Sequence, residues 1–271
     1  VLILYVNIYA VPPLVVSIIR ELGVGHLRAG LLMTTFAVTY CLGNVVMGYL
    51  SDRLGALRVM AAGLALGFIA SLVMSLTGSF ALMVGTRVFS GLAAAAMTTP
   101  CLVTLMRWFP PARRAVSVSL HLAAVTLGSA LVYLLTPLLL PVLSWRSILR
   151  LYALVGGLLL IAFLRLLAGG GATPSPVEQR ARAPLSPPVA RVILLLCAVL
   201  FLTLFQIGGT LTWLPPWLQE RGGFSPLQVG LAGLIFAPVG TASSLLGGHV
   251  ALRAGVRRAR RVVAMSLVGV L

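Results

Sequence analysis

Long runs of apolar residues, separated by short segments that carry the charges, dominate this sequence. The run from Val59 to Leu76 contains no charged side chain, and about 20 apolar residues suffice for a helix to cross a bilayer. Hydrophobic residues make up 60% of the chain and charged residues only 9%, whereas soluble domains carry about 25% charged residues. A soluble core could not bury this much apolar surface, so we expect a membrane protein. In lipid, runs of this length predict an all-α fold, because helices satisfy their own backbone.

The apolar runs predict eight complete membrane spans and part of a ninth. The complete spans cover residues 1–19, 29–50, 57–77, 80–105, 115–140, 147–168, 190–217 and 226–250. The ninth begins near residue 262 and is cut off at Leu271. The first run lacks the basic segment and the cleavage site of a signal peptide, so we interpret it as a span. Since the chain begins inside that run, we expect the natural N-terminus to lie upstream.

The arginines predict the orientation. The net charge is +16, and the 20 basic residues, all arginine, gather between the apolar runs with one exception. If the loop between the second and third spans is cytoplasmic, that side carries 14 arginines and the other side carries five. This asymmetry is the positive-inside pattern and sets the orientation. We expect an integral multi-pass protein of the plasma (inner) membrane. The pattern differs from the basic stripe of a nucleic-acid-binding protein, so that class is excluded.

A segment rich in Gly, Pro and Ala follows the sixth predicted span. It reads AGGGATPSPVEQRARAPLSPP from Ala168 to Pro188, has no apolar periodicity, and is predicted to be a cytoplasmic linker. The expected domains are an N-terminal six-helix bundle (1–167), the linker (168–189) and a partial C-terminal bundle (190–271).

An internal repeat supports the two bundles. Gly48, Arg53, Gly55 and Arg58 recur 200 residues later as Gly248, Arg253, Gly255 and Arg258. Just upstream, Glu21, Gly23, Leu27, Gly30 and Leu31 are echoed by Glu220, Gly222, Leu227, Gly230 and Leu231. Both copies surround the second span of their half, which indicates parallel repeats, a known plan of transporters.

The loop after the second span, GYLSDRLGALR from Gly48 to Arg58, carries the most specific motif. Gly48 permits close helix approach, Asp52 places a carboxylate at a helix end, and Gly55 allows a tight turn. The loop resembles the G-x-L-x-D-R-x-G signature of the major facilitator superfamily, although Ala56 and Leu57 stand where that family usually has basic residues. The resemblance implies a two-bundle fold of six plus six helices. It also implies a conformational latch formed by Gly48, Asp52, Arg53, Gly55 and Arg58, with Gly248, Arg253, Gly255 and Arg258 as the repeat loop.

Arg87 lies inside the fourth apolar run, in GTRVFSGLAAAA, which resembles the family's second motif, R-x-x-x-G. A charge at this depth costs about 2.5 kcal/mol or more and is normally kept for function. Arg87 would bind an anionic group of a substrate or neutralise a carboxylate used in proton coupling. The structural alternative is an arginine tied to backbone carbonyls between helices. WFPPARRA (108–115) and SWRSILR (144–150) resemble further loops of the family, and WLPPWLQERG (213–222) with Asn7 resembles, more weakly, its cyanate and nitroimidazole permeases.

Other polar residues at span depth are candidates to bind substrate, namely Asn7, His121, Gln206, Thr210 and Trp213. The last three are spaced to share one helix face. The alternatives are interhelical hydrogen bonding for Asn7 and Gln206, packing for His121, and an interfacial aromatic belt for Trp213, Tyr5 and Tyr9. The cysteines, Cys41, Cys101 and Cys197, are interpreted as small buried apolar side chains.

No acidic residue lies inside an apolar run, and no convergent catalytic cluster or nucleotide-binding loop is visible. We therefore expect no enzyme, cofactor or metal site. The predicted function is secondary active or facilitative transport of a small anionic or carboxylate-bearing solute by alternating access, with or without a coupling proton or ion. The expected partners are this solute and the bilayer, and no oligomer is required. The alternatives are an exporter of a neutral or amphipathic compound and, from a different class, a non-transporting membrane sensor.

Overall fold

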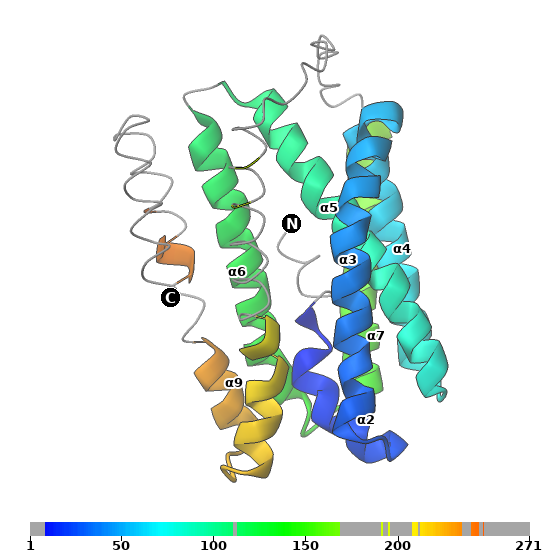
Figure 1. Cartoon of the computed structure of the whole chain (residues 1–271), viewed down its shortest axis with the longest axis vertical. Helices are drawn as coiled ribbons and strands as arrows, with labels where there is room; N and C mark the ends of the chain where they lie inside the picture. Colours follow the sequence, from blue (N-terminus) through cyan, green and yellow to red (C-terminus); the bar gives the residue numbers. More distant parts are fainter. Residues whose placement is uncertain are drawn as a thin grey trace.

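The computed structural model describes residues 9–110, 113–168, 191, 195, 208–210, 212–234, 240–243 and 246. The regular elements in these residues are helices (Figure 1): η1 (Pro12–Leu14), α2 (Val15–Leu22), α3 (His26–Leu54), α4 (Ala56–Leu76), α5 (Phe80–Trp108), α6 (Arg114–Leu139), α7 (Trp145–Ala168) and α9 (Pro226–Leu234). Residues 212–220 are also helical. Helices α3 to α7 are each long and apolar enough to cross a membrane. They confirm the second to sixth predicted spans and the all-α fold.

Short connections make these five helices run alternately up and down the bundle (Figure 1). A single residue, Gly55, separates α3 from α4, and its N–H donates to the carbonyl of Ser51 at 3.1 Å. Its φ of 91° lies in the region that favours glycine. The tight turn predicted at Gly55 is therefore present, and it places Asp52 and Arg58 at the same end of the bundle.

The first predicted span differs from one uninterrupted helix in its described part. A 3-10 turn over Pro12–Leu14 precedes α2, which ends at Gly23 with a φ of 61°. Two consecutive prolines explain the change, because neither offers an N–H to a regular helix. Tyr9 is half-buried and packs against two buried clusters.

Helix α5 is the centre of the bundle and packs against both α3 and α4. The small side chains of its segment 91–96 allow this approach. A Cβ atom added to Gly91 would lie 2.7 Å from the carbonyl oxygen of Phe36, and one added to Gly63 would lie 2.6 Å from the Cβ of Ala96. Small residues are what membrane helices use to pack closely. The glycine of the R-x-x-x-G motif therefore sets the distance between α3 and α5.

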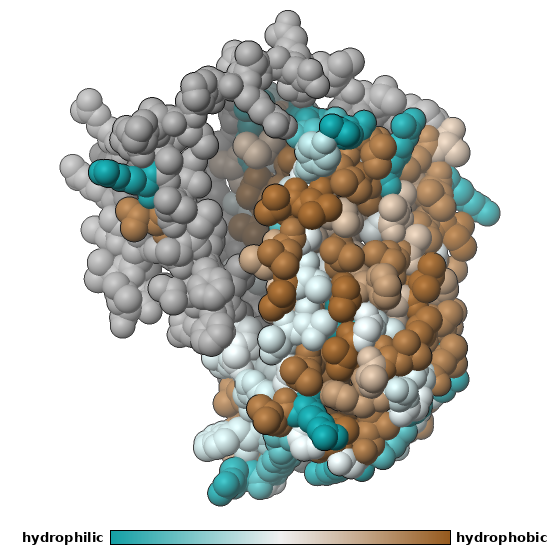
Figure 2. Space-filling model, turned by 45° about the vertical axis from the view of Figure 1, so that its right-hand side comes forward, coloured by the Kyte–Doolittle hydropathy of each residue, from teal (hydrophilic) through white to brown (hydrophobic). Residues whose placement is uncertain are grey.

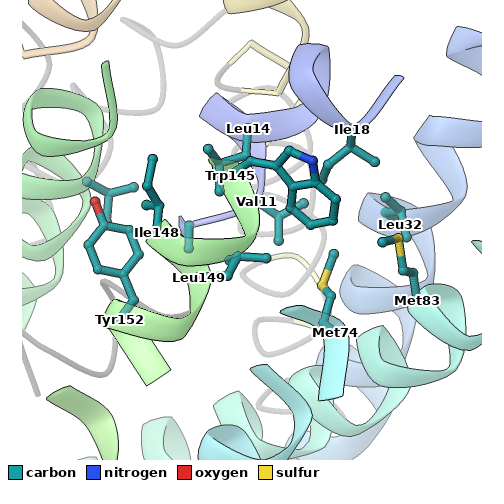
Figure 3. Close-up of a cluster of buried hydrophobic side chains, with 12 residues drawn as sticks. Val11, Leu14, Ile18, Leu32, Met74, Met83, Trp145, Ile148, Leu149 and Tyr152 are labelled. Atoms are coloured by element: carbon teal, nitrogen blue, oxygen red, sulfur yellow. The ribbon is translucent and has the colours of Figure 1, made fainter. Parts of the chain in front are cut away.

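A buried cluster closes the end of the bundle where α2 lies, and Trp145 is at its centre (Figure 3). This side chain, 3% exposed, lies among Val11, Leu14 and Ile18. On the face that Figure 2 shows, apolar residues dominate the middle of the described helices and hydrophilic residues gather at their two ends. Such a surface suits a bilayer between two aqueous faces.

Candidate functional site

Arg87 is the most buried large charged side chain in the described residues. It lies seven residues into α5, about 10 Å from the start of that helix, and is 2% exposed. Its guanidinium carbon lies 5.8 Å from the centroid of the Phe36 ring on α3. One turn further along α5, Gly91 brings the backbone of α3 close, so the R-x-x-x-G motif holds Arg87 against Phe36.

Arg87 has few partners for its charge. Its Nε atom is buried without a hydrogen-bond partner, and none of the ion pairs among the described residues includes Arg87. Phe36 offers a cation–π contact, which is worth about 0.5–2 kcal/mol and does not replace a hydrogen bond. An incompletely satisfied cation at this depth is costly. The arrangement can therefore accept an additional anionic or carbonyl oxygen.

Four polar side chains on α3 and α5 form a seam that the sequence analysis missed. The hydroxyl of Tyr40 donates to Thr98 Oγ1 at 3.3 Å, and the hydroxyl of Thr99 donates to Asn44 Oδ1 at 2.7 Å. Tyr40 and Asn44 are four residues apart in an apolar run, a spacing that places both on one helix face. This spacing in the sequence could have indicated that Tyr40 and Asn44 form a polar contact with a neighbouring helix.

His121 is buried on α6, and its Nδ1 lies 3.5 Å from the Sγ atom of Cys101 on α5. Cys101 is buried as predicted, but its contact with a histidine was not expected, and Cys41 is exposed, contrary to its predicted burial. No group of three or more metal-binding side chains occurs in the described ranges. The contact therefore joins α5 to α6 through His121, the histidine that the sequence predicted to bind substrate.

Trp213 lies at the end of the bundle, away from Arg87. Its ring packs on α3 at Gly30, where an added Cβ would lie 3.3 Å from the Trp213 ring, and the ring centroid is 6.5 Å from that of His26. His26 Nε2 contacts both carboxylate oxygens of Glu220, at 3.0 and 2.9 Å. Thr210 is exposed. The sequence predicted no role for His26, because a histidine at a loop edge carries no pattern of its own.

The predicted latch residues lie at the opposite end. The Asp52 carboxylate is 3.6 Å from the Arg107 guanidinium on α5, and Arg53 lies over the ring of Tyr49 at 4.5 Å. Gly48 approaches Thr99, whose Cγ2 would be 3.6 Å from an added Cβ. Arg107 was not among the predicted latch residues.

Several predicted residues lie outside the described residues, and their predicted roles stay predictions. They are Asn7, Gln206, Gly248, Arg253, Gly255 and Arg258. The same holds for Cys197, Tyr5 and the linker beyond Ala168.

Comparisons with known proteins point to one family. The sequence profile of the Major Facilitator Superfamily matches residues 1–271. The chain is 28% identical over 280 residues to a probable nitrate/nitrite transporter, NarK2, of Mycobacterium tuberculosis, covering 97% of this chain and 67% of that protein. It is 28% identical over 232 residues to the probable chloroplastic anion transporter 3 of Arabidopsis thaliana, covering 76% of this chain and 44% of that protein.

A solved structure supports the fold. The bacterial homologue of the human lysosomal transporter Spinster, in an inward-facing and unoccupied conformation, matches with a TM-score of 0.70 at 17% identity. The match covers 94% of this chain and 61% of that structure. The chain thus spans roughly half to two-thirds of the length of these proteins. These relatives are named as transporters. With a family profile that covers the whole chain and a fold that agrees with it, the chain belongs to the Major Facilitator Superfamily.

Proposed function

We propose that this protein transports a small anionic or carboxylate-bearing solute across the membrane by alternating access, with Arg87 as the main charge of the binding site. The supporting observation is the buried Nε atom of Arg87, which has no hydrogen-bond partner among the described residues. Planar guanidinium groups pair with carboxylates and similar oxyanions through two parallel hydrogen bonds. An incoming anion would therefore supply the partner that Arg87 lacks.

The surroundings of Arg87 favour an anionic substrate over a structural carboxylate. The acidic residues of the chain are Glu21, Asp52, Glu178 and Glu220, and none of them lies inside an apolar run. Glu21, Asp52 and Glu220 are each paired with another basic residue. The relatives named as nitrate/nitrite and anion transporters agree with this direction.

We propose that His121, Thr210 and Trp213, with Asn7 and Gln206, line the pathway to this site. A coupling proton or ion would accompany the solute where transport is active. The arginine asymmetry places the Asp52 end of the bundle in the cytoplasm. The domains would be the bundles 1–167 and 190–271, joined by a cytoplasmic linker at 168–189, in the plasma (inner) membrane.

The test is anion-dependent thermal stabilisation of the purified full-length protein. The ligands are nitrate, phosphate and benzoate, with one neutral and one cationic compound for comparison. Arg87→Ala should abolish stabilisation by the anion that binds the parent. Arg87→Lys should weaken its binding about 10-fold or more, because hydrogen bonds to charged groups contribute about 1.5–3 kcal/mol.

Arg150→Ala is the matched control, because Arg150 is exposed and makes hydrogen bonds only within α7 among the described residues. This variant should bind the anion like the parent. Parental affinity in Arg87→Ala would make Arg87 structural and overturn the anion assignment. Stabilisation of the parent by the neutral compound alone would favour the exporter of a neutral or amphipathic compound. Retained binding without any transport would favour the membrane sensor.

A further inference from the structure

A contact between distant parts of the chain closes the end of the bundle opposite Asp52. It consists of His26 and Gly30 on α3, and of Trp213 and Glu220 from the helical residues 212–220, and is called the His26 contact below. His26 and Glu220 are separated by 194 residues in the chain. In the proposed domain division, the first pair belongs to the N-terminal bundle and the second pair to the C-terminal bundle.

The His26 contact has the properties of a contact that can open. Its ion pair is half-exposed, with relative side-chain exposures of 51% for His26 and 37% for Glu220. Exposed ion pairs contribute about 0.2–1 kcal/mol, so water replaces them at little cost. Trp213 is 39% exposed and rests on a glycine, so the ring can leave without opening a buried core.

The position of the contact places it between the aqueous face and the candidate site. His26 begins α3, Gly30 is one turn further in, and Phe36, which contacts Arg87, lies six residues beyond Gly30. Six residues of helix span about 9 Å. Along the axis of α3, a solute that enters from the His26 end therefore passes the level of Trp213 before it reaches the level of Arg87.

We infer that the His26 contact is the gate on the non-cytoplasmic side: the ion pair between His26 and Glu220 holds Trp213 on Gly30 and keeps that side closed. Opening requires the ion pair to break and Trp213 to leave α3. The inference rests on the proposed function only in that the solute crosses by alternating access between two bundles.

The experiment measures access to Thr34 in the full-length protein. Thr34 is exposed and lies one turn further into α3 than Gly30, on nearly the same face. Thr34→Cys is introduced after Cys41, Cys101 and Cys197 are replaced. A membrane-impermeant thiol reagent is then applied to sealed vesicles of both orientations, and its rate of reaction from the His26 side is recorded.

Glu220→Gln should raise this rate about two- to fivefold, the factor that corresponds to an exposed ion pair. Trp213→Ala should raise it more, about tenfold, because it also removes the aromatic packing on Gly30. The exchange His26→Glu with Glu220→His should return the rate toward the parental value. Arg28→Gln, which removes a neighbouring exposed charge outside the contact, is the matched control and should leave the rate unchanged.

Parental rates in both Glu220→Gln and Trp213→Ala would overturn the gate. So would an exchange variant that reacts as fast as Glu220→Gln, because the ion pair would then have no part in closure. The reaction needs no substrate and no Arg87, so this result is independent of anion binding. The gate can therefore fail while the proposed function stands, and the reverse also holds.

Discussion

Glu21 and Glu220 occupy equivalent positions of the internal repeat, yet their ion pairs differ in kind. Glu21 accepts hydrogen bonds from Trp145 Nε1 and from Arg146, whose guanidinium also donates to the backbone carbonyls of Ser75 and Thr77. This Glu21 cluster (Glu21, Trp145 and Arg146) joins the ends of α2, α4 and α7. Glu220 is about as exposed as Glu21, at 37% against 45%, but has one partner among the described residues, His26.

The difference indicates how one repeated sequence position can serve two mechanical purposes. The Glu21 cluster lies within one predicted bundle and stands directly over the buried core, because Trp145 belongs to both. The His26 contact crosses between the predicted bundles, and Trp213 belongs to none of the buried clusters formed by the described residues. A rigid bundle needs the first kind of contact, and a gate between bundles needs the second. Three comparisons of variants test this distinction.

The largest expected effect is on folding, from Trp145→Ala. This change empties a buried site and leaves Glu21 without one of its donors, so we expect a loss of about 3–5 kcal/mol in unfolding free energy. The measurement is thermal unfolding of the purified full-length protein. Trp213→Ala is the matched control, because Trp213 lies at the same end but is 39% exposed. Equal losses for the two tryptophans would mean that both contacts are structural.

A smaller effect is expected when the two glutamates are compared directly. Glu21→Gln weakens the ion pair with Arg146, whose Nη2 lies 2.9 Å from the carboxylate; because Glu21 is 45% exposed, the expected cost is about 1 kcal/mol. Glu220→Gln should change the stability by no more than about 0.5 kcal/mol. Chemical denaturation of both variants in the same detergent gives the comparison. A reversed order would contradict the assignment of the rigid contact to Glu21.

Much of the fold could be predicted from the sequence because lipid leaves few alternatives. The runs from residue 29 to 168 had to be helices, and their ends are marked by charges or by turn residues such as Gly55. The break at Pro12–Leu14 was harder to foresee, because the hydropathy of the first run stays high through it. The family could be predicted because its motifs are short and local, such as the loop from Gly48 to Arg58.

The contacts of the site were less predictable, since they depend on which helices meet. Arg87 stood out because a charge within an apolar run is rare. His26 and Glu220 did not stand out, because each is an ordinary polar residue beside a loop and their partnership spans 194 residues. The approach of His121 to Cys101 likewise depends on the packing of α5 against α6. The periodicity of a sequence predicts which face of a helix a residue lies on, but not which other helix packs against that face.

The smallest effect on stability is expected from Asp52→Asn, and this change separates exposure from location as the cause of a breakable contact. The Asp52 carboxylate is 53% exposed and 3.6 Å from Arg107, so its loss should change unfolding free energy by no more than about 0.5 kcal/mol. Unlike the His26 contact, this pair joins α3 to α5 within one predicted bundle, at the opposite end.

If Asp52 belongs to a latch that closes the cytoplasmic side, the variant should remain folded, lose most transport, and favour the conformation that is closed at the His26 end. Labelling of Thr34→Cys from that end should then be no faster than in the parent, whereas Glu220→Gln accelerates it. Faster labelling in Asp52→Asn would mean that any exposed ion pair loosens the whole molecule, and the contrast between the two ends would be lost.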